Sequence, residues 1–148
     1  LHRSYQDAAD GRWADYDPVG KTITYYPKFF DATPDQRDTI VAHETGHAIA
    51  DALRNGNLFE QGIFDAWLAR VGDPVFGAQN LNSTRTGPPG RYDDGGSYAQ
   101  PSMRIRTPDE AFAAAYSMIV WEHDTLDQQS HYIHNWMENF LCIRGYCR

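Results

Sequence analysis

The feature that most constrains the fold is one long helix, predicted over residues 33–56 in the stretch "TPDQRDTIVAHETGHAIADALRNG". Thr33 is a good N-cap, Pro34 suits the first helical position, and Gln36 completes a capping box. Gly56 is a natural stop, because a helix commonly ends at a glycine. The remaining elements are placed relative to this helix.

The segments on either side of the long helix predict an α+β fold that is mostly helical. The stretch "RWADYDPVGKTITYYP" alternates aromatic and β-branched residues around a turn at 17–20, which predicts an N-terminal β-hairpin and a small sheet. Helical spacing predicts further helices over 58–72, from Thr107 to about Trp121, and over 131–141. The intervening segment from Gly72 to Arg106 is dense in Gly, Pro, Ser and Asp, which predicts a long irregular loop.

The size and charge of the chain narrow the function classes. A chain of 148 residues can bury one hydrophobic core but is too short for two ordinary domains, so we expect a single domain over 1–148 with its core in 13–141 and a tail over 142–148. No apolar run approaches the ~20 residues that span a bilayer, so we expect no membrane span. A net charge of −7 disfavours nucleic acid and anionic membrane surfaces as partners.

Two cysteines, Cys142 and Cys147, lie in the closing stretch "LCIRGYCR", where Gly145 could make the turn that brings the sulfurs together. A small terminal disulfide is favoured over a pair of free thiols, and it indicates an oxidising compartment, hence a secreted, extracellular protein. The sequence opens at Leu1 without a signal-peptide pattern, so we expect a mature or trimmed domain.

The long helix contains "HETGH", in which His43 and His47 are four residues apart and therefore project from one face. Two imidazoles so placed can hold one zinc ion, and Glu44 beside them can polarise a metal-bound water and shuttle its proton. The structural alternative is a pair of histidines satisfied on a helix surface. The chain has no GxSxG elbow, phosphate-binding glycine loop or CxxC pair. The sequence therefore does not support a serine hydrolase, a nucleotide-binding protein or a zinc ribbon.

A catalytic zinc site needs a third protein ligand. A continuation of the HExxHxxGxxH type would need Gly at 50 and His at 53, but the chain has Ala50 and Leu53, so the ligand must come from a later helix. Glu110 is the leading candidate and Asp109 the fallback. The helix that Glu110 heads carries small residues that allow a close approach to the histidine helix. These are Ala113, Ala114 and Ser117.

Glu110 also has a competing structural explanation. Thr107, Pro108 and Glu110 have the form of a capping box, in which the glutamate turns back to the start of its own helix. One role should dominate, because a carboxylate that caps the helix cannot easily bind a metal ion as well. We favour the ligand role, since nothing else in the chain pairs as well with "HETGH" and Thr107 can cap the helix alone.

Other ionisable clusters have simpler interpretations. In "WEHD", Glu122 and His123 are expected at the end of a helix, where a histidine favours the C-terminal dipole. In "HYIH", His131 and His134 lie about one turn apart and could form a second metal site. A half-exposed pair on an amphipathic helix is the favoured interpretation there.

The stretch "VAHETGHAIAD", followed by "SYA" and then "TPDEAFAAAY", resembles the catalytic domain of the anthrax lethal-factor-like metallopeptidases. This gluzincin group includes the Pro-Pro endopeptidases, and the resemblance covers roughly residues 13–141. It implies a zincin-like fold with zinc bound by His43, His47 and Glu110. It also implies that Glu44 is the general base and that Tyr98 stabilises the oxyanion.

The resemblance does not decide which carboxylate orients the zinc-binding histidines, but it does imply a function. The group carries a second acidic residue one turn after the zinc-binding glutamate, where this chain has Ala114; either that carboxylate is missing, or Asp51 orients a ligand imidazole instead. We expect a zinc-dependent endopeptidase that acts on a protein or peptide, gripped as an extended strand by the loop over 73–106 and the hairpin edge. The alternatives are a non-catalytic zinc-containing binding module, and the protease domain of a larger toxin or effector.

Overall fold

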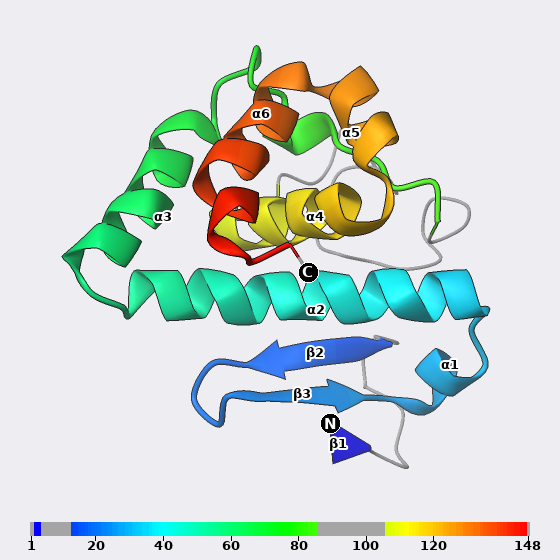
Figure 1. The fold of residues 1–148 in the computed structure, drawn as a ribbon. Coiled ribbons are helices and arrows are strands. Elements are labelled where there is room, and N and C mark those ends of the chain that lie inside the picture. Colours follow the sequence, from blue (N-terminus) through cyan, green and yellow to red (C-terminus); the bar gives the residue numbers. More distant parts are fainter. Residues whose placement is uncertain (1, 4–12, 86–105, 148) are drawn as a thin grey trace.

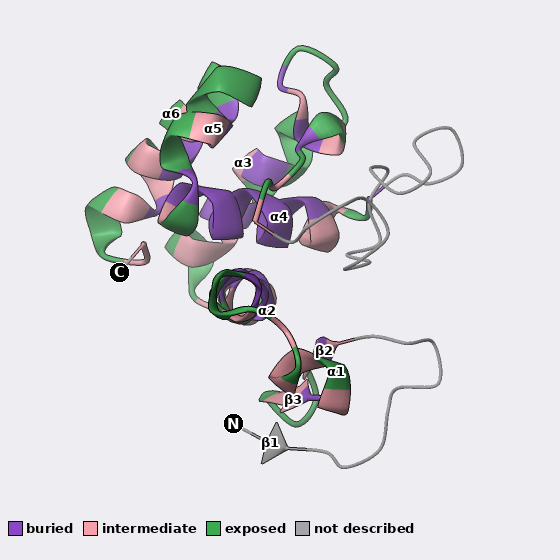
Figure 2. Ribbon diagram, turned by 90° about the vertical axis from the view of Figure 1, so that its right-hand side faces the viewer, coloured by how far each residue is buried: buried purple, intermediate pink, exposed green. Residues whose placement is uncertain are grey.

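The computed structural model describes residues 2–3, 13–85 and 106–147. The described part is mostly helical with a small sheet, as expected for an α+β fold. One long helix, α2 (Pro34–Arg54), runs between the sheet and a layer formed by the later helices (Figure 1). Viewed along its axis, α2 separates the two parts, so each packs against a different face of it (Figure 2).

The predicted long helix is confirmed, and its start has the predicted chemistry. The Thr33 hydroxyl accepts a hydrogen bond from the Gln36 amide, and the Gln36 side chain accepts one from the Thr33 amide. This reciprocal pairing satisfies amide groups that have no partner inside the helix. The C-cap is Asn55, one residue before the expected stop at Gly56.

The predicted hairpin is also confirmed. Strands β2 (Ala14–Asp17) and β3 (Thr22–Tyr25) pair antiparallel, and β1 (His2–Arg3) pairs parallel with β3, so that the strand order is β1-β3-β2. A short helix that the sequence did not predict, α1 (Pro27–Phe30), connects the sheet to α2. A small apolar cluster of Ala14, Tyr25 and Ile40 joins the sheet to α2.

The main core lies on the other side of α2. It is formed by α3 (Leu58–Arg70), α4 (Pro108–Trp121) and α6 (His131–Phe140), with aromatic rings at its centre. Those rings belong to Phe64, Trp67, Phe76, Phe112 and Trp136. Helix α4 is buried over most of its length, because α2 covers one side of it and the other helices cover the rest (Figure 2).

The connecting segments show details that the sequence did not predict. The described part of the predicted irregular loop contains the short helix η1 (Ala78–Asn80) and contributes the fully buried Phe76 and Leu81 to the core, and residues 86–105 of that loop lie outside the described residues. Glu122 caps the end of α4, as expected, but His123 also begins a further helix that the sequence did not predict, α5 (His123–Gln129). The break between α4 and α5 falls at Glu122, whose carboxylate turns inward to accept hydrogen bonds from the residues at 83 and 84.

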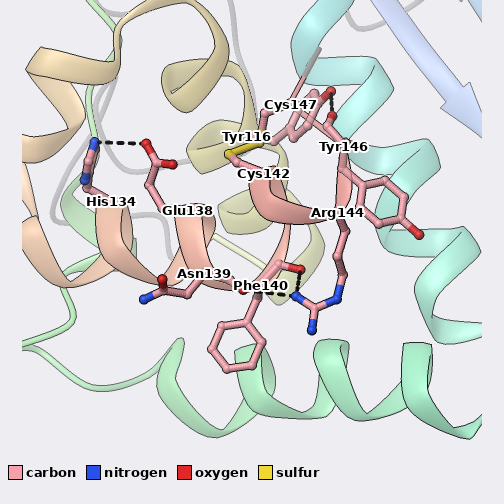
Figure 3. The surroundings of a disulfide bond; sticks show 9 residues. All are labelled: Tyr116, His134, Glu138, Asn139, Phe140, Cys142, Arg144, Tyr146 and Cys147. Atoms are coloured by element: carbon pink, nitrogen blue, oxygen red, sulfur yellow. Dashed lines mark hydrogen bonds and ion pairs between the residues drawn. A yellow bond between two sulfur atoms is a disulfide. The ribbon is translucent and has the colours of Figure 1, made fainter.

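The predicted disulfide between Cys142 and Cys147 is present. Gly145 makes the turn between them with φ of 87°, a left-handed conformation that a side chain would strain. The hydroxyl of Tyr116 in α4 donates to the Tyr146 carbonyl at 2.7 Å and holds the C-terminal segment against the core (Figure 3). Within the described residues, no helix is both long and apolar enough to cross a membrane.

Candidate metal centre

The "HETGH" histidines lie on α2 and face the first turn of α4. The Nε2 atom of His43 is 3.1 Å from one carboxylate oxygen of Glu110, and the Nε2 atom of His47 is 2.9 Å from the other. His43 is buried and the other two side chains are partly enclosed. We call these three residues the α2–α4 group. The structure thus brings together the three residues that the sequence singled out, from two helices, although His43 and Glu110 are 67 positions apart in the chain.

The first turn of α4 places Glu110 opposite the histidines. The Thr107 hydroxyl accepts a hydrogen bond of 3.2 Å from the Glu110 amide, which caps the helix. The indole N–H of Trp67 in α3 donates to the Pro108 carbonyl at 2.9 Å. Because Trp67 is fully buried, this bond ties the start of α4 to the main core.

The helix starts show which role the Glu110 side chain takes. In α2 and α3 the third helical residue completes a capping box by accepting from the N-cap amide. In α4 the cap comes from Thr107, while both carboxylate oxygens of Glu110 are directed at the histidines. Asp109, the fallback ligand, is turned away and pairs with Arg54. The geometry therefore favours Glu110 over Asp109 as the third donor, and favours that role over capping.

A glycine contact sets the distance between the two helices. A Cβ added at Gly46 would lie 2.8 Å from the Cα of Ala113 and 3.1 Å from the Cβ of Tyr116, so no larger residue fits without movement of the backbone. Gly46 lies between the two histidines in the chain, and Ala113 lies one turn after Glu110. The close approach that the small residues of α4 predicted is therefore present, and it occurs beside the three donor side chains.

The two histidines keep the Glu110 carboxylate charged. Burial alone would raise the pKa of Glu110, but hydrogen bonds from His43 and His47 and their charges outweigh it and hold that pKa at about 2. Glu110 is therefore ionised at neutral pH. A carboxylate oxygen and imidazole nitrogens are ordinary ligands of zinc and related divalent ions.

The spacing of the donor atoms can be compared with that of ligands on one ion. Two donors on one tetrahedral zinc are roughly 3.3–3.6 Å apart, as bond lengths near 2.0–2.2 Å require. The observed separations of 2.9 and 3.1 Å are hydrogen-bond distances, and they would have to open slightly to reach this range. The three donor atoms all lie within 4.8 Å of one another, so the described residues fit a divalent cation with three protein ligands.

Glu44 lies beside His43 and is buried, with 4% of its surface exposed. It is one turn beyond Ile40, which packs against Tyr25 of β3. Burial, followed by the negative charge of Glu44, raises the pKa of Tyr25 to about 12. The Tyr25 hydroxyl is buried and has no hydrogen-bond partner among the described residues. No sequence pattern indicated this neutral phenol near the Glu44 carboxylate.

Asp51 has a different role from the one considered for it. Its carboxylate accepts hydrogen bonds from the Tyr16 hydroxyl at 2.7 Å, from Lys21 Nζ at 2.5 Å and from Asn55 Nδ2 at 2.7 Å. Within the described residues it makes no hydrogen bond with His47, so the expectation that it orients a ligand imidazole is not met. Burial raises its pKa, but the bonds from Lys21 and Tyr16 outweigh this and leave it below its ordinary value. Asp51 therefore ties the hairpin to α2.

Asp51 and Tyr16, which join the hairpin to α2, lie in one wall of a pocket of about 240 Å³ beside the α2–α4 group. The pocket is lined by residues of β2, the hairpin turn, α2 and the start of α4. They are Tyr16, Pro18, His47, Asp51, Arg54, Thr107, Asp109 and Glu110. Tyr16 was not predicted to be near the site. The alternation of side chains along the strand could have predicted this position, because Tyr16 shares a face with Ala14, which is buried. Tyr98 lies outside the described residues.

Comparison of the chain with protein-family models, with curated proteins and with solved structures finds no match.

Proposed function

We propose that this chain is a zinc-dependent endopeptidase with a zincin-like fold. The observation that carries the proposal is the convergence of the Glu110 carboxylate with the Nε2 atoms of His43 and His47, with Glu44 next to His43. The resemblance of "HETGH" and "TPDEAFAAAY" to the anthrax lethal-factor-like group supports the same assignment. His43, His47 and Glu110 are the proposed zinc ligands.

Zinc held by these residues would supply Lewis-acid chemistry, lowering the pKa of water and polarising a carbonyl. Glu44 is the proposed general base, which accepts a proton from the attacking water and passes it to the leaving amine. A site that held zinc for structure alone would have no need of a carboxylate at this position. Tyr98 remains the proposed donor to the oxyanion.

The proposed substrate is a protein or peptide bound in an extended form. Strand β2 is at one edge of the described sheet and provides Tyr16 to the wall of the pocket beside the α2–α4 group. An extended chain added along this edge would pass close to the donor residues and gain main-chain hydrogen bonds. The disulfide supports a secreted, extracellular location for this activity.

The test compares the wild-type protein with Glu44→Gln, using a mixed peptide library and zinc analysis on the same samples. We expect cleavage by the wild type, loss of cleavage in Glu44→Gln, and one zinc ion retained at the α2–α4 group in both. A wild-type protein that holds zinc there but cleaves nothing would support the non-catalytic binding module. Equal cleavage by both proteins would reject Glu44 as the base.

A further inference from the structure

A second group of metal-compatible side chains lies on the far side of α4 from α2. Helices α5 and α6 form an antiparallel pair joined at Ser130, and they pack beyond α4 in both views (Figures 1 and 2). His123 begins α5, while His134 and Glu138 are one turn apart on α6. One donor atom from each of the three lies within 4.8 Å of the others. We call this set the α5–α6 group.

We propose that the α5–α6 group is a second, exchangeable zinc site. The Nε2 atom of His134 is 3.7 Å from a carboxylate oxygen of Glu138, and both side chains lie on the same side of α6 (Figure 3). A direct hydrogen bond would need about 2.7–3.2 Å. Two donors on one zinc ion are roughly 3.3–3.6 Å apart, so the observed spacing is closer to a shared ion than to a hydrogen bond.

His134 provides the strongest indication. Its side chain is only 16% exposed, and both ring nitrogens are buried without a hydrogen-bond partner in the described part of the chain. A buried imidazole usually has partners for its N–H and its lone pair. An ion bound at Nε2 would take the lone pair, and Asp127, 3.7 Å from Nδ1, is placed to approach the remaining N–H.

The surrounding residues hold the donors in place. The Ser130 hydroxyl donates to the Phe76 carbonyl at 2.6 Å and accepts from the Ile133 amide at 3.1 Å, which fixes the start of α6. His131 Nδ1 is 2.6 Å from a carboxylate oxygen of Asp127 and positions that side chain. His131 therefore acts as a support here, and not as the second ligand beside His134, which was the less favoured interpretation of "HYIH".

The exposure of the other donors makes the site open. The side chains of His123 and Glu138 are 55% and 44% exposed, so an ion can enter and leave without unfolding the protein. Water would fill the remaining coordination position. Zinc suits the site because it accepts two imidazoles and a carboxylate in tetrahedral geometry.

The first test is zinc stoichiometry by equilibrium dialysis at low micromolar free zinc. We expect two ions per chain in the wild type, one in Glu138→Gln, one in His123→Ala and two in the control Gln128→Ala, which changes an exposed residue of α5 outside the group. An unchanged stoichiometry in both Glu138→Gln and His123→Ala would overturn the proposal. Loss of an ion in His131→Ala alone would overturn this donor set in favour of His131 with His134.

Two further measurements separate this site from the α2–α4 group and from loss of folding. In Glu110→Ala, added zinc should still raise the Tm, and the rise should vanish in Glu110→Ala combined with Glu138→Gln. In the unmodified protein, the second equivalent of zinc should shift the ring ¹⁵N resonances of His123 and His134. Resonances that stay in place through that addition would reject the site, whatever happens at the α2–α4 group.

Discussion

The α2–α4 group and the α5–α6 group use the same donors, two histidines and a glutamate, but they are assembled in different ways. The first takes both histidines from one long helix and its glutamate from another, and the two helices meet at Gly46. The second takes a histidine and a glutamate from one helix and adds a histidine from its neighbour in the chain. The first lies against the main core, and the second lies largely at the surface.

The two groups differ in how tightly their donor geometry is fixed. The α2–α4 group depends on long-range packing, because Glu110 is held by a cap, by an indole hydrogen bond and by a glycine contact. The α5–α6 group depends on a local helix pair with exposed donors. We therefore expect a preorganised, tightly held ion at the first group and an exchangeable one at the second.

The largest expected effect is loss of zinc from the α2–α4 group in Glu110→Ala. Removal of one of three ligands should weaken binding by more than the roughly 10–100-fold typical of losing an outer-shell partner. The matched control is Asp109→Ala, which removes the adjacent carboxylate, paired with Arg54 at a partly exposed position. Competition with a chelator would measure both affinities. Equal losses in the two variants would show that charge, and not ligation by Glu110, holds the ion.

The next effect is steric and acts on stability. Gly46→Ala places a Cβ against the Ala113 backbone, and overpacking of this kind costs about 2 kcal/mol. Gly62→Ala is the control, because a Cβ at Gly62 meets nothing within 4 Å and should stabilise α3 by about 0.5–1 kcal/mol. Urea unfolding would report both changes. In Gly46→Ala, zinc affinity should fall at the α2–α4 group alone. An equal fall at the α5–α6 group would show that the two groups do not depend on different packing contacts.

The sequence predicted those parts of the fold that local chemistry controls. The capping box at Thr33 and the turn at 17–20 are read from neighbouring residues, and both elements appear where expected. Helix α5 could not be found this way, because it begins where Glu122 accepts hydrogen bonds from residues nearly 40 positions earlier. A break imposed by a distant partner has no local pattern.

The same distinction explains the candidate sites. Four-residue spacing identified His43 and His47, and small residues on a later helix indicated Glu110. Asp51 was one of two alternatives for the residue that orients an imidazole, because it lies one turn after His47, but its partners are Tyr16 and Lys21 of the hairpin and Asn55. For "HYIH", the sequence favoured a half-exposed pair of histidines over a second metal site. In the structure His131 is exposed and His134 mostly buried, and the donor atoms close to His134 come from His123 and Glu138.

A smaller effect should depend on pH. The folded pKa of Asp51 lies below its ordinary value, so its stabilising contribution is present above the unfolded pKa and is lost as the pH falls through the folded pKa. Asp51→Asn should cost about 1.5 kcal/mol at neutral pH, through weaker bonds from Tyr16 and Lys21. The difference from the wild type should shrink in acid. Urea midpoints across the acid range, with the exposed Asp65→Asn as the control, would measure it; a difference independent of pH would reject the charged interaction.

The smallest predicted effect separates the two functions that Thr107 and Glu110 share at the start of α4. Thr107→Ala removes the hydroxyl that accepts from the Glu110 amide and should cost about 1 kcal/mol, whereas Thr107→Ser should keep the cap. Because the cap fixes the turn that carries Glu110, we also expect weaker zinc binding at the α2–α4 group in the alanine variant. Ser130 is a matching cap for α6, so the α5–α6 group should be unaffected by either change. If Thr107→Ala lowers stability but leaves zinc affinity intact, the core contacts of α4 alone are enough to position Glu110.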